Sequence, residues 1–396
     1  MEEVKDLNII PIKILSVDDE PDMQELLKQK FRKKIKSGEY EFHFANNGQE
    51  ALQKLEEVRD IDFVLCDINM PVMDGLTFLG KAQEVRNSIL KTIMVTAYGD
   101  IDNIRKAMNN GAFDFLNKPI NFEDLEITMQ KTLEQISKEK ASQSNHEILV
   151  SIQKDLEIAK NIQLSLVPHS FPPFPNVKKI EIFATIDSAK MVGGDFYDYF
   201  FIDDEHLGFV IGDVSGKGIS GAIFMAMTRT IVRTISQKGI DASKCMEDAN
   251  NLICCESIDS MFVTVFYGIL NINTGEVEYS NAGHCPPYIL RNNGLLEKIP
   301  STGDIVLGIM DEMPYKMKKI KLEKGEEIFI FTDGVTEAMN VNDELFSEKR
   351  LEALLLTLHQ KPIEEINKSV VKNVKEFAGK AEQSDDITTL TVKYVG

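Results

Sequence analysis

The sequence is poor in basic residues, in cysteines and in long apolar runs, and each shortage excludes a class of protein. Its 44 lysines and arginines are outnumbered by 63 aspartates and glutamates, a net charge of −19 at pH 7. A nucleic-acid partner is therefore not expected, because phosphate backbones require a basic surface. No apolar stretch is long enough to span a bilayer, and the first six residues lack the pattern of a signal peptide. The five cysteines have no CxxC or zinc spacing, so we expect buried, reduced thiols in a cytoplasmic protein with no membrane partner.

The 396 residues are enough for two domains, and two kinds of patterning divide them. From residue 12 to about 136, short apolar runs alternate with helical periodicity, which indicates an α/β domain with a parallel sheet. Its strands are expected at 12–17, 41–45, 63–66, 93–96 and 113–116. Beyond Pro168 we expect an α+β domain. Its strands are expected at 180–186, 207–211, 262–269, 277–281, 288–291 and 328–331, and its helices near 219–236, 242–256, 348–359 and 363–377.

The segment between these regions, residues 122–166, has almost no glycine or proline and is predicted to be helical. Apolar residues recur from Leu125 to Ile136 and again from Leu149 to Ala159, but the two series are out of register across 137–145. We interpret this as two helical segments joined by a stutter or a break. Either they form a coiled coil with a second chain, or each helix belongs to its own domain. The predicted boundaries are 10–135 for the first domain, 136–167 for the linker and 168–394 for the second domain.

Polar groups with complementary chemistry follow the predicted strands of the first domain. They are Asp18, Asp19, Asp67, Thr96 and Lys118. Because the carboxyl ends of parallel strands meet at one edge of a sheet, this set can bind Mg2+ and a phosphoryl group together. With the Lys-Pro step at 118–119 and the loop at 69–75, the pattern resembles the receiver domain of response regulators over about residues 10–135. The resemblance implies a flavodoxin-like fold with a five-stranded parallel sheet.

The receiver resemblance also implies roles for single residues. Asp67 would be the phosphoacceptor, a carboxylate nucleophile that forms an aspartyl phosphate. Mg2+ would be held by Asp18, Asp19, Asp67 and the backbone carbonyl of Asn69. Thr96 and Lys118 would bind the phosphoryl oxygens, and Phe115 occupies the aromatic switch position without the hydroxyl of the commoner Tyr. A sensor histidine kinase is the implied phosphodonor. The alternative is a degenerate receiver that only mediates contacts.

Four aspartate motifs in the second domain lie where apolar runs meet glycine or polar turns. They are Gly193-Gly194-Asp195-Phe196-Tyr197-Asp198, Gly212-Asp213-Val214-Ser215-Gly216-Lys217-Gly218, Phe331-Thr332-Asp333-Gly334 and Ser384-Asp385-Asp386-Ile387-Thr388. Carboxylates gathered in this way repel one another, by about 4 kcal/mol for one pair at ~4 Å and an effective dielectric of 20. Such a cluster is stable only around cations, and an all-oxygen set suits Mg2+ or Mn2+ rather than zinc. The motifs therefore predict a metal-dependent hydrolase.

The first of these motifs has some likeness to the GGDEF signature of diguanylate cyclases, but Phe196 replaces its acidic residue and the motif lies too early in the domain. The four motifs together resemble the SpoIIE/RsbU branch of the PPM protein phosphatases. The resemblance covers about residues 150–394 and includes the helical segment 156–168, the Asn-Ala-Gly-His sequence at 281–284 and Leu-Gly-Ile at 307–309. It implies a β-sandwich flanked by helices.

The phosphatase resemblance implies two or three Mn2+ or Mg2+ ions, and a metal-bridging water that attacks phosphorus. The implied ligands are Asp195, Asp213, Asp333, Asp385 and the Val214 carbonyl. Lys190 is either a phosphate-binding residue or an ordinary solvated lysine. His284 is more readily a structural histidine than a general acid, and Asp198 and Asp386 either support the metal ligands or cap turns.

These inferences predict a two-component response regulator whose output is a Mg2+/Mn2+-dependent protein serine/threonine phosphatase, regulated by phosphorylation of Asp67. Relatives with this architecture act on phosphorylated STAS-domain anti-sigma-factor antagonists in partner switching, so the resemblance implies that substrate class. Coupling through a helical linker predicts a homodimer. The rival interpretation is a catalytically silent phosphatase fold that sequesters a signalling partner under receiver control.

Overall fold

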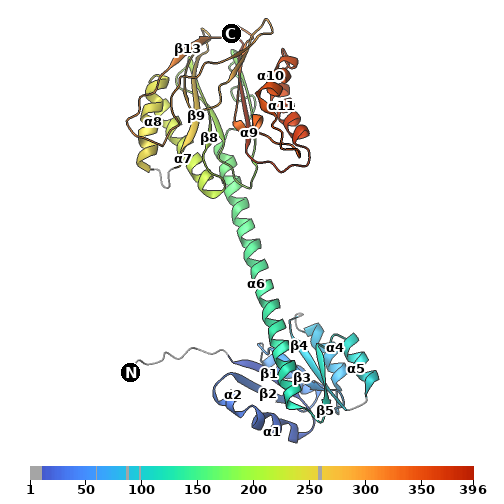
Figure 1. Ribbon diagram of the computed structural model, residues 1–396. Helices are drawn as coiled ribbons and strands as arrows, with labels where there is room; N and C mark the ends of the chain where they lie inside the picture. Colours follow the sequence, from blue (N-terminus) through green and yellow to red (C-terminus); the bar gives the residue numbers. More distant parts are fainter. Residues whose placement is uncertain (1–10, 59, 86–88, 98–99, 257–260) are drawn as a thin grey trace, which may run out of the picture. The chain divides into compact units, whose positions relative to one another are not determined.

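The computed structural model describes residues 11–396 except 59, 86–88, 98–99 and 257–260. The chain folds into two compact units, Met1–Ser151 and Ile152–Gly396 (Figure 1). Within the described residues, none of the helices combines the length and the hydrophobicity needed to cross a membrane. The cysteines form no disulfide, and Cys66 and Cys245 are buried. The expectation of burial is wrong for Cys255, which is exposed.

The first unit contains a five-stranded parallel sheet of order β2-β1-β3-β4-β5, as the receiver resemblance predicts. The strands are β1 (Ile12–Val17), β2 (Tyr40–Ala45), β3 (Phe63–Asp67), β4 (Lys91–Ala97) and β5 (Asp114–Lys118). Every predicted strand of this sheet is present, with ends within two residues of those expected. The central strand β3 is buried along its whole length, which explains why its sequence is a continuous apolar run.

Helices cover both faces of this sheet. They are α1 (Pro21–Lys30), α2 (Arg32–Lys36), α3 (Gly48–Glu57), α4 (Gly75–Val85), α5 (Ile101–Asn109) and the start of α6 (Phe122–Leu166). One apolar core joins the sheet to α3, α4 and α5, and the other joins it to α1 and α6. In the second core Leu125, Met129 and Ile136 of α6 are buried. The first turns of α6 therefore belong to the packing of the receiver unit.

The linker helix α6 is one uninterrupted helix, so the predicted break within it is wrong. The polar stretch 137–145 interrupts the apolar pattern but contains no glycine or proline, and its residues are compatible with a helix. Side-chain hydrogen bonds four residues apart, Gln135 to Glu139 and Gln143 to Glu147, stabilise the helix at both ends of this stretch. The loss of apolar register thus marks the point where the helix leaves the receiver core, and not its end.

The second unit is a sandwich of two antiparallel five-stranded sheets. Its strands are β6 (Ile180–Asp187), β7 (Phe196–Phe201), β8 (His206–Val214), β9 (Val263–Asn271), β10 (Glu276–Ala282), β11 (Tyr288–Leu290), β12 (Leu296–Lys298), β13 (Lys318–Lys321), β14 (Glu327–Phe331) and β15 (Ile387–Tyr394). The sheet orders are β13-β10-β9-β8-β7 and β12-β11-β14-β15-β6. One apolar core, contributed by both sheets, fills the space between them.

Helices cover the outer faces of the sandwich (Figure 1). Helices α7 (Ile219–Ser236) and α8 (Ala242–Glu256) pack on the sheet that contains β8, whereas α10 (Ser347–Thr357) and α11 (Ile363–Ala378) pack on the sheet that contains β14. A short helix, α9 (Asp333–Thr336), follows β14. The predicted β-sandwich flanked by helices is confirmed, although β7, β12, β13 and β15 were not among the predicted strands.

Candidate functional site

The four aspartates predicted as metal ligands stand at one end of the sandwich. Asp195 immediately precedes β7, and Asp213 is the last residue but one of β8. These strands pair so that Phe196 lies opposite Gly212, which brings the two aspartates together. Asp333 and Asp385 are delivered in the same way by the antiparallel pair β14 and β15. Two antiparallel strand pairs, one in each sheet, thus direct all four carboxylates to the same end of the sandwich.

The electrostatics of these carboxylates show that they crowd one another. Burial, followed by repulsion from Asp333 and Asp385, raises the pKa of Asp213 to about 7. Burial and Asp385 raise the pKa of Asp333 to about 6. Asp195 is fully buried, and its pKa is raised by burial and by Asp213. Hard divalent cations bind oxygen ligands, and their positive charge would offset the repulsion between these carboxylates. The four residues therefore fit such ions.

The phosphatase-side aspartates are more widely spread than the receiver ones. Of the acidic, histidine and cysteine groups in the described residues, only Asp18, Asp19 and Asp67 place three ligand atoms all within 4.8 Å of one another. A spread set of four carboxylates suits two ions about 3.5–4 Å apart better than a single ion.

A lysine that the sequence interpretation missed lies within this cluster. Lys217 Nζ is 2.9 Å from Asp385 Oδ2 and also donates to the Ser384 carbonyl. It belongs to the Gly216–Gly218 segment, where both glycines have positive φ, of 115° and 84°. The predicted phosphate-binding residue Lys190 is exposed on the loop before Asp195. Lys217, not Lys190, is therefore the lysine in direct contact with an aspartate of the cluster. Its position between Gly216 and Gly218, in the motif that contains Asp213, could have identified it from the sequence.

Asp386 holds the loop that carries Asp195. Its carboxylate accepts hydrogen bonds from the backbone N–H of Ala189 at 2.8 Å, of Gly194 at 2.7 Å and of Asp195 at 3.3 Å. A Cβ on Gly193 would lie 2.1 Å from this carboxylate, and one on Gly194 would lie 3.0 Å from the Val214 carbonyl oxygen. The glycine pair is therefore needed so that the loop can approach Asp386 and the end of β8.

Two further buried side chains fix the same loop. Thr332 Oγ1 donates to Asp195 Oδ2 at 2.8 Å. The Gln163 amide of α6 makes two hydrogen bonds with the backbone of Gly193. Sequence reasoning missed both residues, although Thr332 lies inside the Phe331–Gly334 motif and Gln163 inside the helical segment 156–168. Neither offers a charge or a metal-ligand spacing that would have singled it out.

Asp198 faces away from the cluster. It is fully buried on the face of β7 that packs against α7, where Arg229 Nη2 lies 2.8 Å and Arg233 Nη1 2.9 Å from its carboxylate. Burial raises the pKa of Asp198 against the opposing effect of the two arginines. It neither supports a metal ligand nor caps a turn, because alternation along the strand places it with Phe196 and Phe200 against the helix.

His284 is buried as well. Its Nδ1 lies 2.9 Å from the Thr264 hydroxyl, and its backbone N–H donates to Asn281. Burial lowers the pKa of His284 to about 4, so the ring is neutral at physiological pH. This environment favours the structural interpretation of His284, because a neutral, enclosed imidazole has no proton to give as a general acid.

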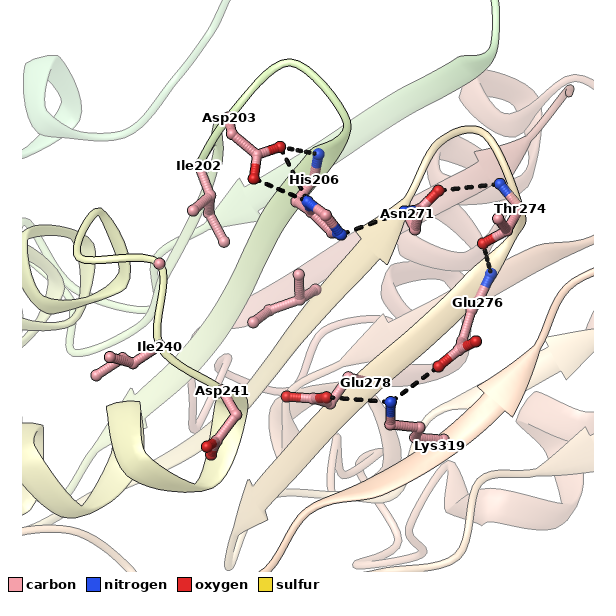
Figure 2. A pocket seen from close by; sticks show the side chains of 12 residues that line it. Ile202, Asp203, His206, Ile240, Asp241, Asn271, Thr274, Glu276, Glu278 and Lys319 are labelled. Atoms are coloured by element: carbon pink, nitrogen blue, oxygen red, sulfur yellow. Dashed lines mark hydrogen bonds and ion pairs between the residues drawn. The ribbon is translucent and has the colours of Figure 1, made fainter.

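A separate hollow of about 360 Å³ lies where the β7–β8 and β9–β10 turns meet the α7–α8 connection (Figure 2). Its acidic side chains already have structural partners: Glu278 accepts from the N–H of Ala242, and Asp241 from that of Lys244. His206 is held between Asp203 and Asn271. These contacts fix the start of α8 and the turns, so this hollow is not the candidate site.

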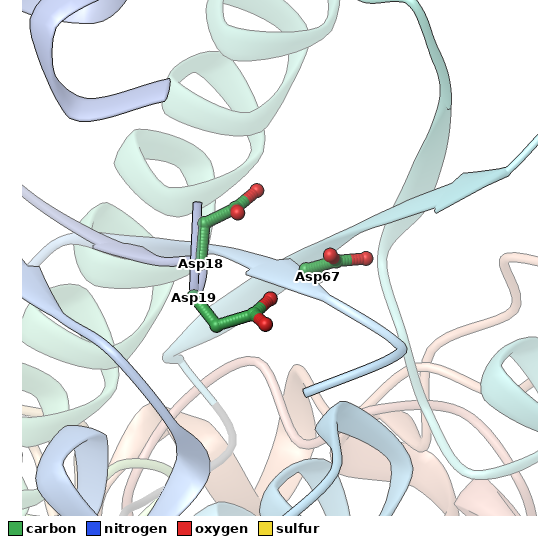
Figure 3. A group of neighbouring side chains, drawn as sticks. All are labelled: Asp18, Asp19 and Asp67. Carbon is green, nitrogen blue, oxygen red and sulfur yellow. The ribbon is translucent and has the colours of Figure 1, made fainter. Parts of the chain in front are cut away.

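The receiver aspartates form a second, compact cluster at the carboxyl ends of β1 and β3 (Figure 3). Lys118 Nζ lies 2.7 Å from Asp67 Oδ2 and 3.0 Å from Asp18 Oδ2. Burial alone would lower the pKa of Lys118, but its hydrogen bonds with both carboxylates raise it above the ordinary value. Burial raises the pKa of Asp18. Three clustered carboxylates, only two of which contact the lysine, fit an added divalent cation.

The remaining residues of the receiver motif lie in β4, in β5 and in the segment that follows β3. Thr96 is fully buried at the end of β4, and its hydroxyl has no hydrogen-bond partner among the described residues. The Asn69 N–H donates to Asp67 Oδ1 at 3.4 Å. A Cβ on Gly75 would lie 2.1 Å from the Asp67 carbonyl oxygen, which explains the glycine after Asp74. Phe115 is half-buried against the core beneath α4 and α5.

Comparison with known proteins agrees with the division of the chain into two units. The family model "Response regulator receiver domain" matches residues 14–130, and the model "Stage II sporulation protein E (SpoIIE)" matches residues 203–395. "Phosphoserine phosphatase RsbU" of Bacillus subtilis is 30% identical over 246 residues, which are 61% of this chain and 70% of RsbU. "Protein IcfG" of Synechocystis is 31% identical over 268 residues, 60% of this chain but only 41% of IcfG.

The solved structure of the "SiaA-PP2C domain of Pseudomonas aeruginosa" superposes with a TM-score of 0.56 at 18% identity, covering 62% of this chain and 98% of that domain. At this identity the likeness concerns the fold alone. The class is therefore a receiver domain joined by a helix to a PP2C-type phosphatase fold. Within that class, the chain belongs to the SpoIIE family, with RsbU among its relatives.

Proposed function

We propose that this chain is a response regulator whose output is a divalent-metal-dependent protein serine/threonine phosphatase. The observation that carries the proposal is the crowding of Asp195, Asp213, Asp333 and Asp385 at one end of the sandwich, which raises the pKa of Asp213 to about 7. Such repulsion is costly for a fold to keep unless cations are bound there. Lys217, which is 2.9 Å from Asp385, supplies only one of the charges needed.

These aspartates and the Val214 carbonyl would hold the metal ions, which would supply a water of lowered pKa for attack on phosphorus. The chain's own groups prepare the site for it. Asp386 and Thr332 fix the position of Asp195, and the glycines at 216 and 218 let the chain turn from β8 into α7. Lys217 can bind the substrate phosphate if Asp385 engages a metal, a role that the sequence interpretation gave to Lys190.

The substrate we propose is a phosphoserine or phosphothreonine of a partner protein, of the STAS-domain anti-sigma-factor antagonist class. Support comes from the family resemblance and from RsbU, whose name states phosphoserine phosphatase. The receiver is proposed to control this activity through Mg2+-assisted phosphorylation of Asp67 by a sensor histidine kinase. The proposed ligands of the phosphoryl oxygens are the Lys118 ammonium and the Thr96 hydroxyl, which has no hydrogen-bond partner among the described residues.

We further propose a homodimer formed along α6. Aliphatic side chains in its second half are about half exposed: Ile148, Leu149, Ile152, Ile158 and Ile162. Apolar side chains in such a row are best covered by another helix. The proposed organisation is a receiver over 10–135, a helical linker over 136–167 and a phosphatase over 168–394.

The decisive experiment measures phosphate release from a phosphoserine protein with added Mn2+. Asp213→Asn is expected to lower turnover by more than the roughly 10–100-fold that is lost when residues supporting a metal ligand are changed. Asp203→Asn, the same substitution at the exposed β7–β8 turn, is the matched control and should leave turnover unchanged. Wild-type protein without metal-dependent release would support the rival function, a silent phosphatase fold that sequesters its partner.

A further inference from the structure

The C-terminal end of α6 makes a direct polar contact with the loop that carries Asp195. Gln163 Nε2 donates to the Gly193 carbonyl at 2.5 Å, and the Gly193 N–H donates to Gln163 Oε1 at 3.1 Å. One side-chain amide therefore satisfies both polar groups of one residue, two positions before Asp195. A displacement of Gln163 would break both hydrogen bonds together.

Gln163 differs from its neighbours on the helix. Its side chain is 8% exposed, whereas Asn161 and Ile162 beside it are exposed and Gln153, ten residues earlier, is exposed as well. A buried amide without partners is costly, so Gln163 remains buried only while Gly193 stays in reach. The burial of Gln163 and the position of the loop are thus mutually dependent.

The loop is held between α6 on one side and the phosphatase core on the other. Asp386 binds the N–H groups of Ala189, Gly194 and Asp195, and its carboxylate leaves no room for a Cβ on Gly193. Asp386 belongs to the core through β15, which follows it directly. Of these two anchors, Gln163 is the one that a movement of α6 would displace.

We propose that Gln163 is a positioning residue that relays the state of α6 to the metal-binding loop. While its amide holds Gly193, Asp195 is aligned with Asp213. When α6 turns or shifts, both hydrogen bonds break, Gly193 is no longer fixed from the side of α6, Asp195 is held by Asp386 and Thr332 alone, and affinity for divalent metal falls. This inference rests on the proposed function, since it assigns to a contact of the linker helix the control of the proposed metal site.

The test compares Gln163→Glu with Gln153→Glu in the full-length protein. Gln163→Glu keeps the side chain's size but replaces the donor to the Gly193 carbonyl by a carboxylate oxygen that repels it. Gln153→Glu makes the same change on the same helix at an exposed position. Mn2+ affinity is measured by titration with electron paramagnetic resonance, and protection of residues 189–195 is measured by hydrogen exchange.

Gln163→Glu is expected to weaken Mn2+ binding in the phosphatase site by at least about tenfold and to raise hydrogen exchange in 189–195, while Gln153→Glu changes neither. The receiver aspartates would also bind Mn2+, so all proteins carry Asp67→Asn together with Asp18→Asn and Asp19→Asn, which removes that site from the measurement. Unchanged Mn2+ affinity and exchange in Gln163→Glu would overturn the proposal. If this variant does not fold, Gln163→Met, which lacks both hydrogen bonds but adds no charge, is judged by the same two readouts.

The relay itself is tested in proteins that retain Asp67. In Gln163→Glu, the ratio of phosphate release with and without acetyl phosphate should fall to about one, whereas Gln153→Glu should keep the wild-type ratio. A wild-type ratio in Gln163→Glu would overturn the relay. Because Mn2+ affinity and hydrogen exchange require no turnover, they test the positioning role even if the wild-type protein releases no phosphate, an outcome that would refute the proposed function instead.

Discussion

Replacing Asp198 by asparagine removes a buried negative charge that two arginines share. Asp198 is completely buried, Arg229 is 14% exposed, and both arginines approach the carboxylate to within 3 Å, at 2.8 and 2.9 Å. In Asp198→Asn the Arg229 guanidinium would stay in the same enclosed place without a counter-charge. Breaking a buried ion pair in this way costs about 3–5 kcal/mol. We therefore expect the free energy of unfolding of the phosphatase domain to fall by roughly that amount.

Thermal unfolding followed by circular dichroism measures this loss. For a domain of about 150–250 residues, 1 kcal/mol corresponds to ~2–4 °C in Tm, so Asp198→Asn should lower the Tm of the phosphatase transition by roughly 6–20 °C. Metal affinity at 25 °C should stay within about twofold of wild type, because Asp198 packs against α7 and contacts no residue of the aspartate cluster. Asp203→Asn, which alters an exposed ion pair with His206, should cost less than about 1 kcal/mol.

A compensating variant tests whether the loss of stability arises from the unpaired arginine charge. Replacing Asp198, Arg229 and Arg233 together by leucine removes every charge of the group, and such replacements are often neutral or stabilising. The triple variant should recover much of the Tm lost in Asp198→Asn. A wild-type Tm in Asp198→Asn, or a loss of metal affinity in a variant that remains stable, would show that Asp198 does not act by compensating the charge of the two arginines. The second result would restore the interpretation of Asp198 as a support for the metal ligands.

Three further predictions concern the receiver, the linker and the pH dependence of stability. Asp67→Asn should abolish labelling by radioactive acetyl phosphate, because Asp67 is the carboxylate that Lys118 contacts at 2.7 Å, and undiminished labelling would place the acceptor elsewhere. Insertion of four residues at Ser142 should uncouple phosphate release from acetyl phosphate without abolishing basal turnover, whereas an insertion of seven serves as the control; regulation that survives the four-residue insertion would contradict coupling through α6. His284 has its pKa lowered to about 4 by burial, against about 6.5 when unfolded, so the unfolded chain binds the extra proton between these values. The contribution of His284 to stability is therefore full above pH 6.5 and falls by roughly 3 kcal/mol as the pH drops to 4, so urea titrations should show the stability of His284→Gln rising relative to wild type over this range.

Much of the candidate site could be predicted because its residues combine two local signals. Asp67, Asp213 and Asp333 each follow or end an apolar run, and Asp213 and Asp333 are also followed within three residues by a glycine. In the parallel receiver sheet the carboxyl ends of the strands meet at one edge, so the placement of Asp18 and Asp67 followed from the strand pattern. What could not be predicted is which groups already bind the carboxylates. Lys217 and Thr332 reach them through turns whose geometry depends on the packed sheets.

The missed strands differ in cause, and in β15 the apolar pattern of the sequence does not reflect the burial of the strand. Strand β15 is almost wholly buried, yet it contains Thr388, Thr389 and Thr391 where an apolar run would be expected. Asn367 of α11 accepts a hydrogen bond from Thr389 at 2.6 Å and donates one to Thr391 at 2.7 Å. These tertiary hydrogen bonds offset the desolvation of the two buried hydroxyls, and they cannot be seen in the sequence of β15. The burial of Asp198 could not be predicted for the same reason, because its arginine partners lie on a helix more than thirty positions away in the sequence.

The continuity of α6 changes how the two domains can communicate. A broken linker could absorb a movement of the receiver at the break, but an unbroken helix of 45 residues transmits rotation and translation along its axis. Four inserted residues turn one end relative to the other by about 40° and lengthen the helix by ~6 Å, whereas seven turn it by only about 20° in the opposite sense but lengthen it by ~10 Å. Gln163 holds Gly193 through two directional hydrogen bonds, and such bonds weaken steeply with misalignment. Rotation of α6 is therefore the movement to which the contact is most sensitive, and an insertion that restores the phase of the helix should restore regulation even though it makes the helix longer.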